Sequence, residues 1–259
     1  MIKFFRHIRK SLLMENKTGS SGHFSRSGKY FKYAIGEIVL VVIGILIAIQ
    51  LNEWRHDSSN TKQKQIVLNA LQLEFEANLK QLDTVLFYMG KVQEYYPIAV
   101  KMIENSEENY SKEKISNLIK NLSYTWTFNP SNGALRSAIS SSQIHLLENN
   151  RLIELLFSWE DVVKDSEEEA IRLRQYQYDS NSKLTNYIRI ADIWHSEFPE
   201  MEATKSPYNY RGFLKDVFFE NYSTLSYAFA YEYTLELNTI KNQNKEILIL
   251  IKEDLKEND

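Results

Sequence analysis

A hydrophobic run near the N-terminus constrains the fold of this 259-residue chain more than any other feature. The twelve residues from 38 to 49 are all apolar or glycine, and the longer stretch 33–51 contains only two polar side chains, Glu37 and Gln50. Because an α-helix rises 1.5 Å per residue, these nineteen residues would reach about 28 Å, close to the hydrocarbon thickness of a bilayer. A buried core helix is the alternative for a run this short, but its flanks favour a single transmembrane helix over residues 33–54.

The charges on the two sides of this run are very unequal. Residues 1–32 carry eight Lys or Arg and one acidic residue, a net charge of +7; since the whole chain carries −3, residues 33–259 carry −10. Short basic segments stay in the cytoplasm, so we expect a cytoplasmic N-terminus and an exported remainder, residues 55–259. Three aromatic residues stand where interfacial anchors are expected: Tyr30, Tyr33 and Trp54.

A cleaved signal peptide is the main alternative for the same segment. Its basic region would be 32 residues long, which is unusually extended, and no small-x-small cleavage pattern follows the run. We therefore favour an uncleaved signal anchor. The first fourteen residues are basic and amphipathic, which is typical of a helix lying on the anionic cytoplasmic leaflet. Its expected lipid-facing basic residues are Lys3, Arg6, Arg9 and Lys10. The Ser- and Gly-rich residues 19–28 then form a linker within the predicted segment 1–32.

Two features inside the predicted membrane helix are chemically unusual. Glu37 lies in its first turns, where an ionised carboxylate is costly unless it reaches the headgroups or finds a partner. Gly36, Gly44 and Ala48 are spaced by eight and four residues, so they share one face on which a second helix could approach closely. Glu37 is explained either by snorkelling to the headgroups or by a contact with another helix. The face of small residues gives weak support for a homo-oligomer.

The composition favours long helices for the rest of the chain. There are only 8 Gly and 4 Pro, too few for the many tight turns of a β-sandwich or barrel. Three apolar stripes with spacings of three and four residues begin at Leu68, Leu152 and Leu225. We predict an all-α fold, in which the transmembrane helix is followed by an extracytoplasmic antiparallel helical bundle over residues 55–259.

Local signals predict where the first helices begin and end. A polar hinge is expected over residues 55–64, between the membrane helix and the first stripe. Gly90 and Pro97 are expected to mark the far end of that stripe, and a further break is expected over residues 105–110.

The later helix boundaries have clearer signals. Asn129-Pro130-Ser131 predicts the start of a helix that the three serines 140–142 would end early. Asn149 or Asn150 is expected to cap the next helix, which would continue towards Tyr187. A final helix is expected to reach Leu255.

The search for catalytic chemistry finds no signature. The absence of Cys excludes disulfides, cysteine nucleophiles and thiolate metal sites, and no phosphate-binding loop, dinucleotide fingerprint or nucleophile elbow is present. The Glu-x-x-His pair at Glu53 and His56 occurs once, where a di-iron site needs two such pairs. The acidic run 160–169 is expected to be a solvated helix face, and the −10 charge disfavours nucleic acid as a partner. We therefore predict no catalytic residue, no metal and no cofactor.

Two stretches resemble an uncharacterised family of single-pass membrane proteins typical of Bacteroidota-type bacteria, catalogued as a domain of unknown function. The first is residues 33–48 (YAIGEIVLVVIGILIA), together with the opening residues 1–6 and the trailing residues 50–54. The second is residues 128–152. The chain departs from the family pattern by a longer Ser/Gly insert between residues 18 and 29. The resemblance implies a cell inner-membrane protein with its C-terminal domain in the periplasm and with no assigned activity.

These observations together predict a membrane-anchored interaction, scaffold or sensor-like module that acts by binding, not an enzyme. Its expected partners are the lipid bilayer and a membrane or extracytoplasmic protein. The alternative is an oligomerising membrane effector that perturbs the bilayer through the Glu37 and glycine face of its transmembrane helix. An unrecognised enzyme would require acidic side chains from several helices to converge with His145 or His195 in one cavity.

Overall fold

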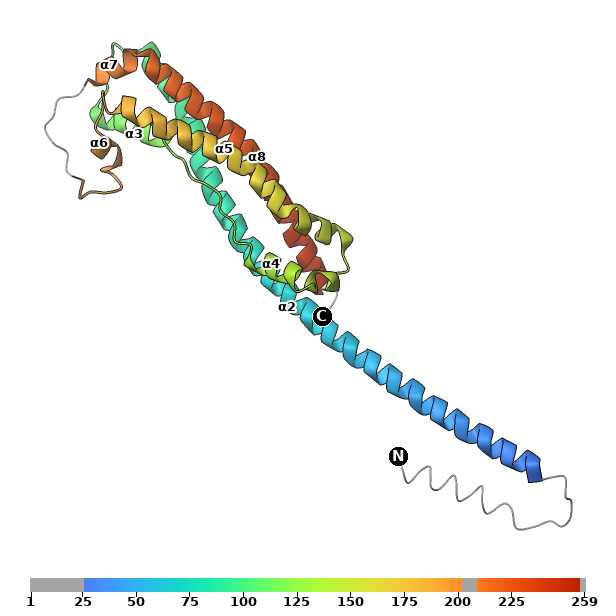
Figure 1. The fold of residues 1–259 in the computed structure, drawn as a ribbon. Coiled ribbons are helices and arrows are strands. Elements are labelled where there is room, and N and C mark those ends of the chain that lie inside the picture. Colours follow the sequence, from blue (N-terminus) through green and yellow to red (C-terminus); the bar gives the residue numbers. More distant parts are fainter. Residues whose placement is uncertain (1–25, 202–208, 257–259) are drawn as a thin grey trace. The chain divides into compact units, whose positions relative to one another are not determined.

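The computed structural model describes residues 26–201 and 209–256, with side chains described from residue 34 onward. Every regular element within these ranges is helical, and none is a β-strand (Figure 1). The predicted all-helical fold class is therefore confirmed for the described part of the chain. The helices divide between two compact units, Met1–Ser59 and Asn60–Asp259.

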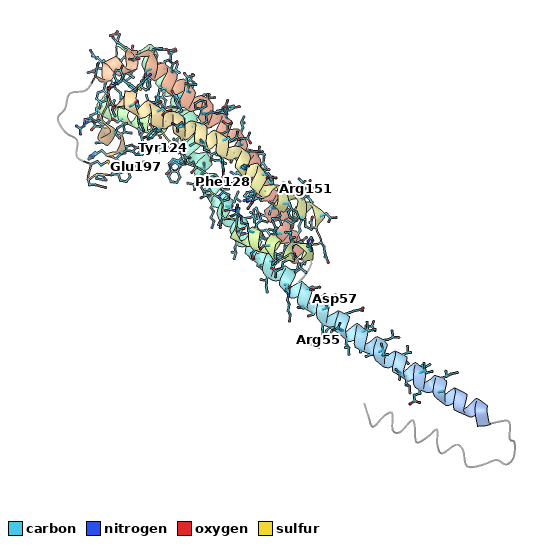
Figure 2. All side chains as sticks on the ribbon, viewed as in Figure 1. Arg55, Asp57, Tyr124, Phe128, Arg151 and Glu197 are labelled. Carbon is cyan, nitrogen blue, oxygen red and sulfur yellow. The ribbon has the colours of Figure 1, made fainter. Side chains whose placement is uncertain are left out.

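The longest helix, α2, spans Arg26–Glu104 and contributes residues to both units. The predicted hinge over residues 55–64 is wrong, because these residues are helical. Figure 2 labels Arg55 and Asp57 on the continuous helical ribbon. The segment is polar but contains neither Gly nor Pro, so nothing in it breaks a helix. Residues 55–59 of this segment are exposed, so their polar side chains face solvent.

Gly90 and Pro97 also do not end α2, contrary to expectation. Both residues are exposed, so water can reach the backbone carbonyl that Pro97 leaves without an N–H donor. The expected break over residues 105–110 is confirmed, because α2 ends at Glu104 and the next helix begins at Lys112.

The second unit continues with one 3-10 turn and six helices among its described residues, in the order α3 Lys112–Leu122, α4 Gly133–Ser140, η1 Gln143–Leu146, α5 Asn150–Leu184, α6 Ile190–Trp194, α7 Tyr210–Lys215 and α8 Val217–Lys256. The early end of α4 at Ser140 and the cap of α5 are confirmed, but α4 begins at Gly133, so Asn129-Pro130-Ser131 precede the helix and do not open it. Helix α4 is short, and the Asn149 side chain caps α5 by accepting a hydrogen bond from the Leu152 N–H at 3.1 Å. Helix α5 ends three residues before Tyr187.

The directions of the three long helices follow from their contacts. Helix α8 runs opposite to α2, since Gln93 bonds Thr234 while Lys241 pairs with Asp83. It also runs opposite to α5, where Gln177 bonds Ser226 and Gln243 bonds the Leu155 carbonyl. Helices α2 and α5 run parallel to each other, because the chain between them returns along α2 (Figure 1).

The core of the second unit lies between these three helices. The expected stripes supply it: Leu68, Leu71 and Phe75 of α2 are fully buried, as are Trp159 and Leu173 of α5. Burying each such side chain contributes about 1.5–3 kcal/mol to the free energy of folding. The Trp159 ring meets Phe75 edge to face, with centroids 4.9 Å apart.

Candidate functional site

The residues predicted for membrane contact fall into three groups. The basic residues predicted to face lipid lie outside the described residues; they are Lys3, Arg6, Arg9 and Lys10. For the predicted anchors Tyr30 and Tyr33, only the backbone is described, as part of α2. The side chains of Trp54, Glu37 and Ala48 are exposed on the helical part of the first unit. A Cβ added at Gly36 or Gly44 would meet no atom within 4 Å.

The helix that holds these residues is the one described helix long and apolar enough to cross a membrane. It lies near the N-terminus, and its most apolar 18-residue window has a mean hydropathy of 2.6 with no buried residue. A core helix of equal hydropathy would bury most of that surface. The exposed apolar side chains here run from Ile35 to Leu51.

The histidines that an enzyme would need do not gather with carboxylates. The Nδ1 atom of His195 lies 2.8 Å from the Met201 carbonyl oxygen, and His145 lies on the 3-10 turn η1. Across the described ranges, no group of three His, Asp or Glu side chains could hold a metal ion.

The second unit contains a concave surface that was not predicted from the sequence. This groove has a volume of about 800 Å³ and is open to solvent. It is formed by α2, by the chain after α3 and by the region from α6 to Met201; its lining residues are Gln81, Thr84, Val85, Tyr88, Ser123, Tyr124, Thr125, Trp126, Thr127, Asn129, Trp194, Glu197, Phe198 and Met201. We refer to it as the aromatic groove, because five of these side chains are aromatic.

The centre of the aromatic groove is a pair of stacked rings. Trp126 lies flat on Tyr88, with centroids 4.4 Å apart and ring planes within 1° of parallel. Tyr124 meets the same Tyr88 ring edge to face at 4.7 Å. Trp126 is nevertheless 46% exposed, because Tyr88 covers only one of its faces. A large aromatic side chain that is packed on one face and half exposed is typical of a binding surface.

The extended segment 123–129 carries Tyr124 and Trp126 and is fixed at both ends. The Ser123 hydroxyl donates to the Ile119 carbonyl at 2.6 Å, and its oxygen lies 2.8 Å from the oxygen of the buried Tyr222 hydroxyl. At the other end, the Phe128 N–H donates to Tyr233 and the Asn129 N–H donates to Gln81. These bonds satisfy backbone groups that no helix or sheet supplies, so the segment holds a defined extended path.

The same hydrogen bonds reach into the bundle core. The Tyr222 hydroxyl donates to Gln177 Oε1 at 2.8 Å, and Gln177 Nε2 donates to the Leu122 carbonyl and to Ser226. Burial, as the largest effect, raises the pKa of Tyr222 far above its ordinary value. This network therefore holds the start of segment 123–129 against α5 and α8.

The charged group of the aromatic groove is neutralised by a lysine. Glu197 lies at the same end of the second unit as Tyr124, and its Oε1 is 2.7 Å from the Lys120 ammonium (Figure 2). Lys120 also donates to the Ser196 hydroxyl at 3.0 Å. Burial and then the Glu197 carboxylate raise the pKa of the Tyr124 hydroxyl, so this group stays neutral and able to donate a hydrogen bond.

A sequence signal for the aromatic groove does exist. Residues 123–128 read Ser-Tyr-Thr-Trp-Thr-Phe, an alternation of hydroxyl and aromatic side chains with a period of two. In a helical protein this pattern indicates an extended segment with one aromatic side. The partners Tyr88 and Trp194 carry no comparable signal, because they come from distant helices.

Comparison with known proteins places the chain in a family. No curated protein and no solved structure matches it at a significant level. A family model described as "Family of unknown function (DUF6090)" matches residues 37–188, a span that includes the apolar part of α2, the extended segment 123–129 and all of α5. Since this match covers more than half of the chain, the protein belongs to the DUF6090 family of unknown function.

Proposed function

We propose that this protein is a membrane-anchored helical module that acts by binding a ligand or partner in its aromatic groove, outside the cytoplasm. The observation that carries the proposal is the half-exposed Trp126 on its Tyr88 support, within an open groove of about 800 Å³. That volume falls within the range of about 300–1,000 Å³ that is usual for ligand sites.

The first unit supports anchoring in a membrane. Its apolar side chains between residues 34 and 51 have no core to pack against in the described chain. Exposing so much apolar surface to water is costly, whereas a lipid interior would bury it. The +7 charge of residues 1–32 favours a cytoplasmic N-terminus and hence a periplasmic helical bundle at the cell inner membrane.

The chemistry of the aromatic groove supports binding instead of catalysis. Glu197 is the one carboxylate among its lining residues, and its charge is paired with Lys120. A general acid–base mechanism needs a second group poised to take or give a proton, and the lining offers only the tyrosines Tyr88 and Tyr124. The −10 charge of residues 33–259 disfavours nucleic acid as the partner.

Site-specific photocrosslinking in intact cells tests this function. The crosslinking residue benzoylphenylalanine would replace Met201, whose exposed side chain lines the groove, in the full-length protein. The matched control places it at Tyr178, which is 74% exposed on α5 away from the groove lining. We expect a discrete adduct from position 201 and none from position 178.

Each result of the crosslinking experiment has a defined meaning. Equal adducts from both positions would overturn specific binding at the groove, and no adduct from position 201 would overturn a protein partner there. An adduct between two copies would identify the partner as a second copy of the chain. Fusing a reporter that is active only in the periplasm to the C-terminus tests the orientation, and an inactive reporter would contradict it.

A further inference from the structure

We propose that the ligand of the aromatic groove is a neutral oligosaccharide, with one sugar ring stacked on the free face of Trp126. This proposal rests on the proposed binding function and specifies its ligand. Three observations lead to it: the geometry of the ring stack, the unpaired polar groups around it and the charge balance of the groove.

The stack presents a flat apolar surface of the size of a sugar ring. A pyranose ring has a face of C–H groups, and laying that face on an indole removes apolar surface from water on both sides. Tyr88 supports the other face of Trp126, and Tyr124 packs against Tyr88 edge to face. The indole is thus already ordered before binding, so little side-chain entropy remains to be lost.

Several polar groups around the stack have no hydrogen-bond partner among the described residues. The Oε1 of Gln81 accepts from the Asn129 N–H, but its Nε2 donates to no described residue. The same is true, within the described ranges, of the Tyr124 hydroxyl and the Trp126 indole N–H. Sugar hydroxyls both donate and accept, so they match this mixed set. An acyl chain would leave these groups dehydrated and unpaired, which costs free energy for each group.

The charge balance favours a neutral ligand. The Glu197 carboxylate is paired with Lys120, so the groove offers no free charge from this pair to a cation or an anion. A cage for a quaternary ammonium needs several aromatic faces turned to one point, whereas Tyr88 uses one of its faces to support Trp126. The volume of about 800 Å³ lies near the upper end of ligand sites, which suits several linked rings better than one.

Fluorescence titration of the full-length protein in detergent micelles tests the proposal. The probes are maltotetraose, cellotetraose and the tetramer of N-acetylglucosamine. Trp126 and Trp194 line the groove, whereas Trp159 is buried and Trp54 belongs to the first unit. We expect at least one probe to change the emission saturably, with a Kd below about 10 mM.

Variants localise the binding. Trp126→Ala should weaken it by at least about tenfold, as truncation of an aromatic anchor does. Tyr124→Phe keeps the ring and removes one hydroxyl, so it should weaken binding by roughly two- to tenfold. Tyr231→Ala, at an exposed aromatic position on α8 outside the groove lining, should leave the Kd unchanged. Thermal melts of all three variants would show that they are folded.

The results distinguish a failure of the sugar proposal from a failure of the proposed binding function. If no tetrasaccharide gives a saturable change, or if folded Trp126→Ala binds equally well, the sugar proposal is overturned. A protein adduct from position 201 would then leave the binding function standing, with a peptide as the ligand class. Absence of both sugar binding and the crosslinked adduct would overturn both proposals.

Discussion

Asn244 is the residue least suited to its surroundings. It is fully buried in α8, and neither its amide nitrogen nor its amide oxygen has a hydrogen-bond partner among the described residues. An unpaired buried polar group costs about 1–3 kcal/mol. A buried amide can nevertheless favour one register of packed helices over others, because only that register tolerates it.

Replacing Asn244 with leucine should therefore stabilise the protein. We expect Asn244→Leu to raise the free energy of unfolding by about 1–3 kcal/mol, because it removes the unpaired amide and keeps a similar volume. Gln177→Leu is the matched control and should lower stability, since the Gln177 amide bonds Tyr222, Ser226 and the Leu122 carbonyl. Urea unfolding measures both changes, and a destabilised Asn244→Leu would contradict the first.

Asp216 gives the stability of the second unit a dependence on acid. Its carboxylate accepts hydrogen bonds from the Tyr187 hydroxyl and from the Phe218 N–H, and these two bonds, in that order of size, lower its pKa below the ordinary 3.8. A carboxyl with a lowered folded pKa adds stability that is complete above its unfolded pKa. That contribution is lost as the pH falls through the folded value.

The Tyr187→Phe variant tests this acid dependence. At about pH 7 its melting temperature should lie below that of the unaltered protein, and the difference should shrink as the pH falls through the folded pKa of Asp216 and the carboxylate becomes protonated. Tyr178→Phe, at an exposed position, should show no difference at any pH. If the melting temperature of Tyr187→Phe is lower by the same amount at every pH, the effect of the substitution comes from packing and not from the Asp216 carboxylate.

At the scale of a helix, Gly90 is a weak point in α2. Its backbone is helical, and a Cβ at this position would meet nothing within 4 Å. Glycine in a helix interior is less favourable than alanine by roughly 0.5–1 kcal/mol. Gly90→Ala should therefore stabilise the protein by that amount in urea unfolding. Gly212→Ala should not, because its Cβ would meet the Asn209 side chain that caps α7.

The exposed apolar helix of the first unit can be tested by charge. Arginine at the centre of a membrane helix costs about 2.5–3.5 kcal/mol on insertion, so Ile43→Arg with Leu46→Arg should move the protein from the membrane to the soluble fraction. The control pair, Ile66→Arg with Leu73→Arg, adds the same charge at exposed positions of α2 in the second unit and should stay membrane-bound. Equal release of both variants would argue against a membrane span.

The sequence predicted some elements well and others poorly for physical reasons. Apolar spacing identified the buried stripes, and the Asn149 cap was found because a cap depends on neighbouring residues. The false hinge over residues 55–64 arose because periodicity reports one-sided burial, and a helix exposed on all sides has none. Gly90 and Pro97 misled for a different reason: both lie on the exposed side of α2, and the buried side chains of the same helix keep it continuous despite their low helix propensity.

The aromatic groove could not be predicted because it joins three segments that are far apart in the chain. Segment 123–129 passes beside α2 only because the chain returns along that helix after α3, as the bond from Asn129 to Gln81 shows. Trp194 and Glu197 arrive from beyond α5. Composition supplies the aromatic residues, but only the topology of the bundle brings them to one surface.

At the scale of the whole molecule, the folded core belongs to one unit. Every described residue from 34 to 59 is exposed, and the buried residues begin at Lys64, with the apolar core extending from Val67 to Ile251. The second unit therefore does not draw on the described side chains of the first for its core. About 200 residues are enough to bury a self-sufficient core without disulfides or metals.

Residues 60–259 alone should consequently fold as an independent soluble domain. We expect the fragment to unfold cooperatively in urea, with a free energy within about 1 kcal/mol of the full-length protein in detergent, because separated parts contribute additively. Removing residues 1–59 also removes the basic segment 1–32, and the acidic charge that remains favours solubility. A fragment that stays in aggregates, or that has helical circular dichroism without a cooperative transition, would mean that the bundle depends on residues 1–59 for its structure. A cooperative fragment would also allow sugar titrations without detergent, in which Trp126 is read without the emission of Trp54.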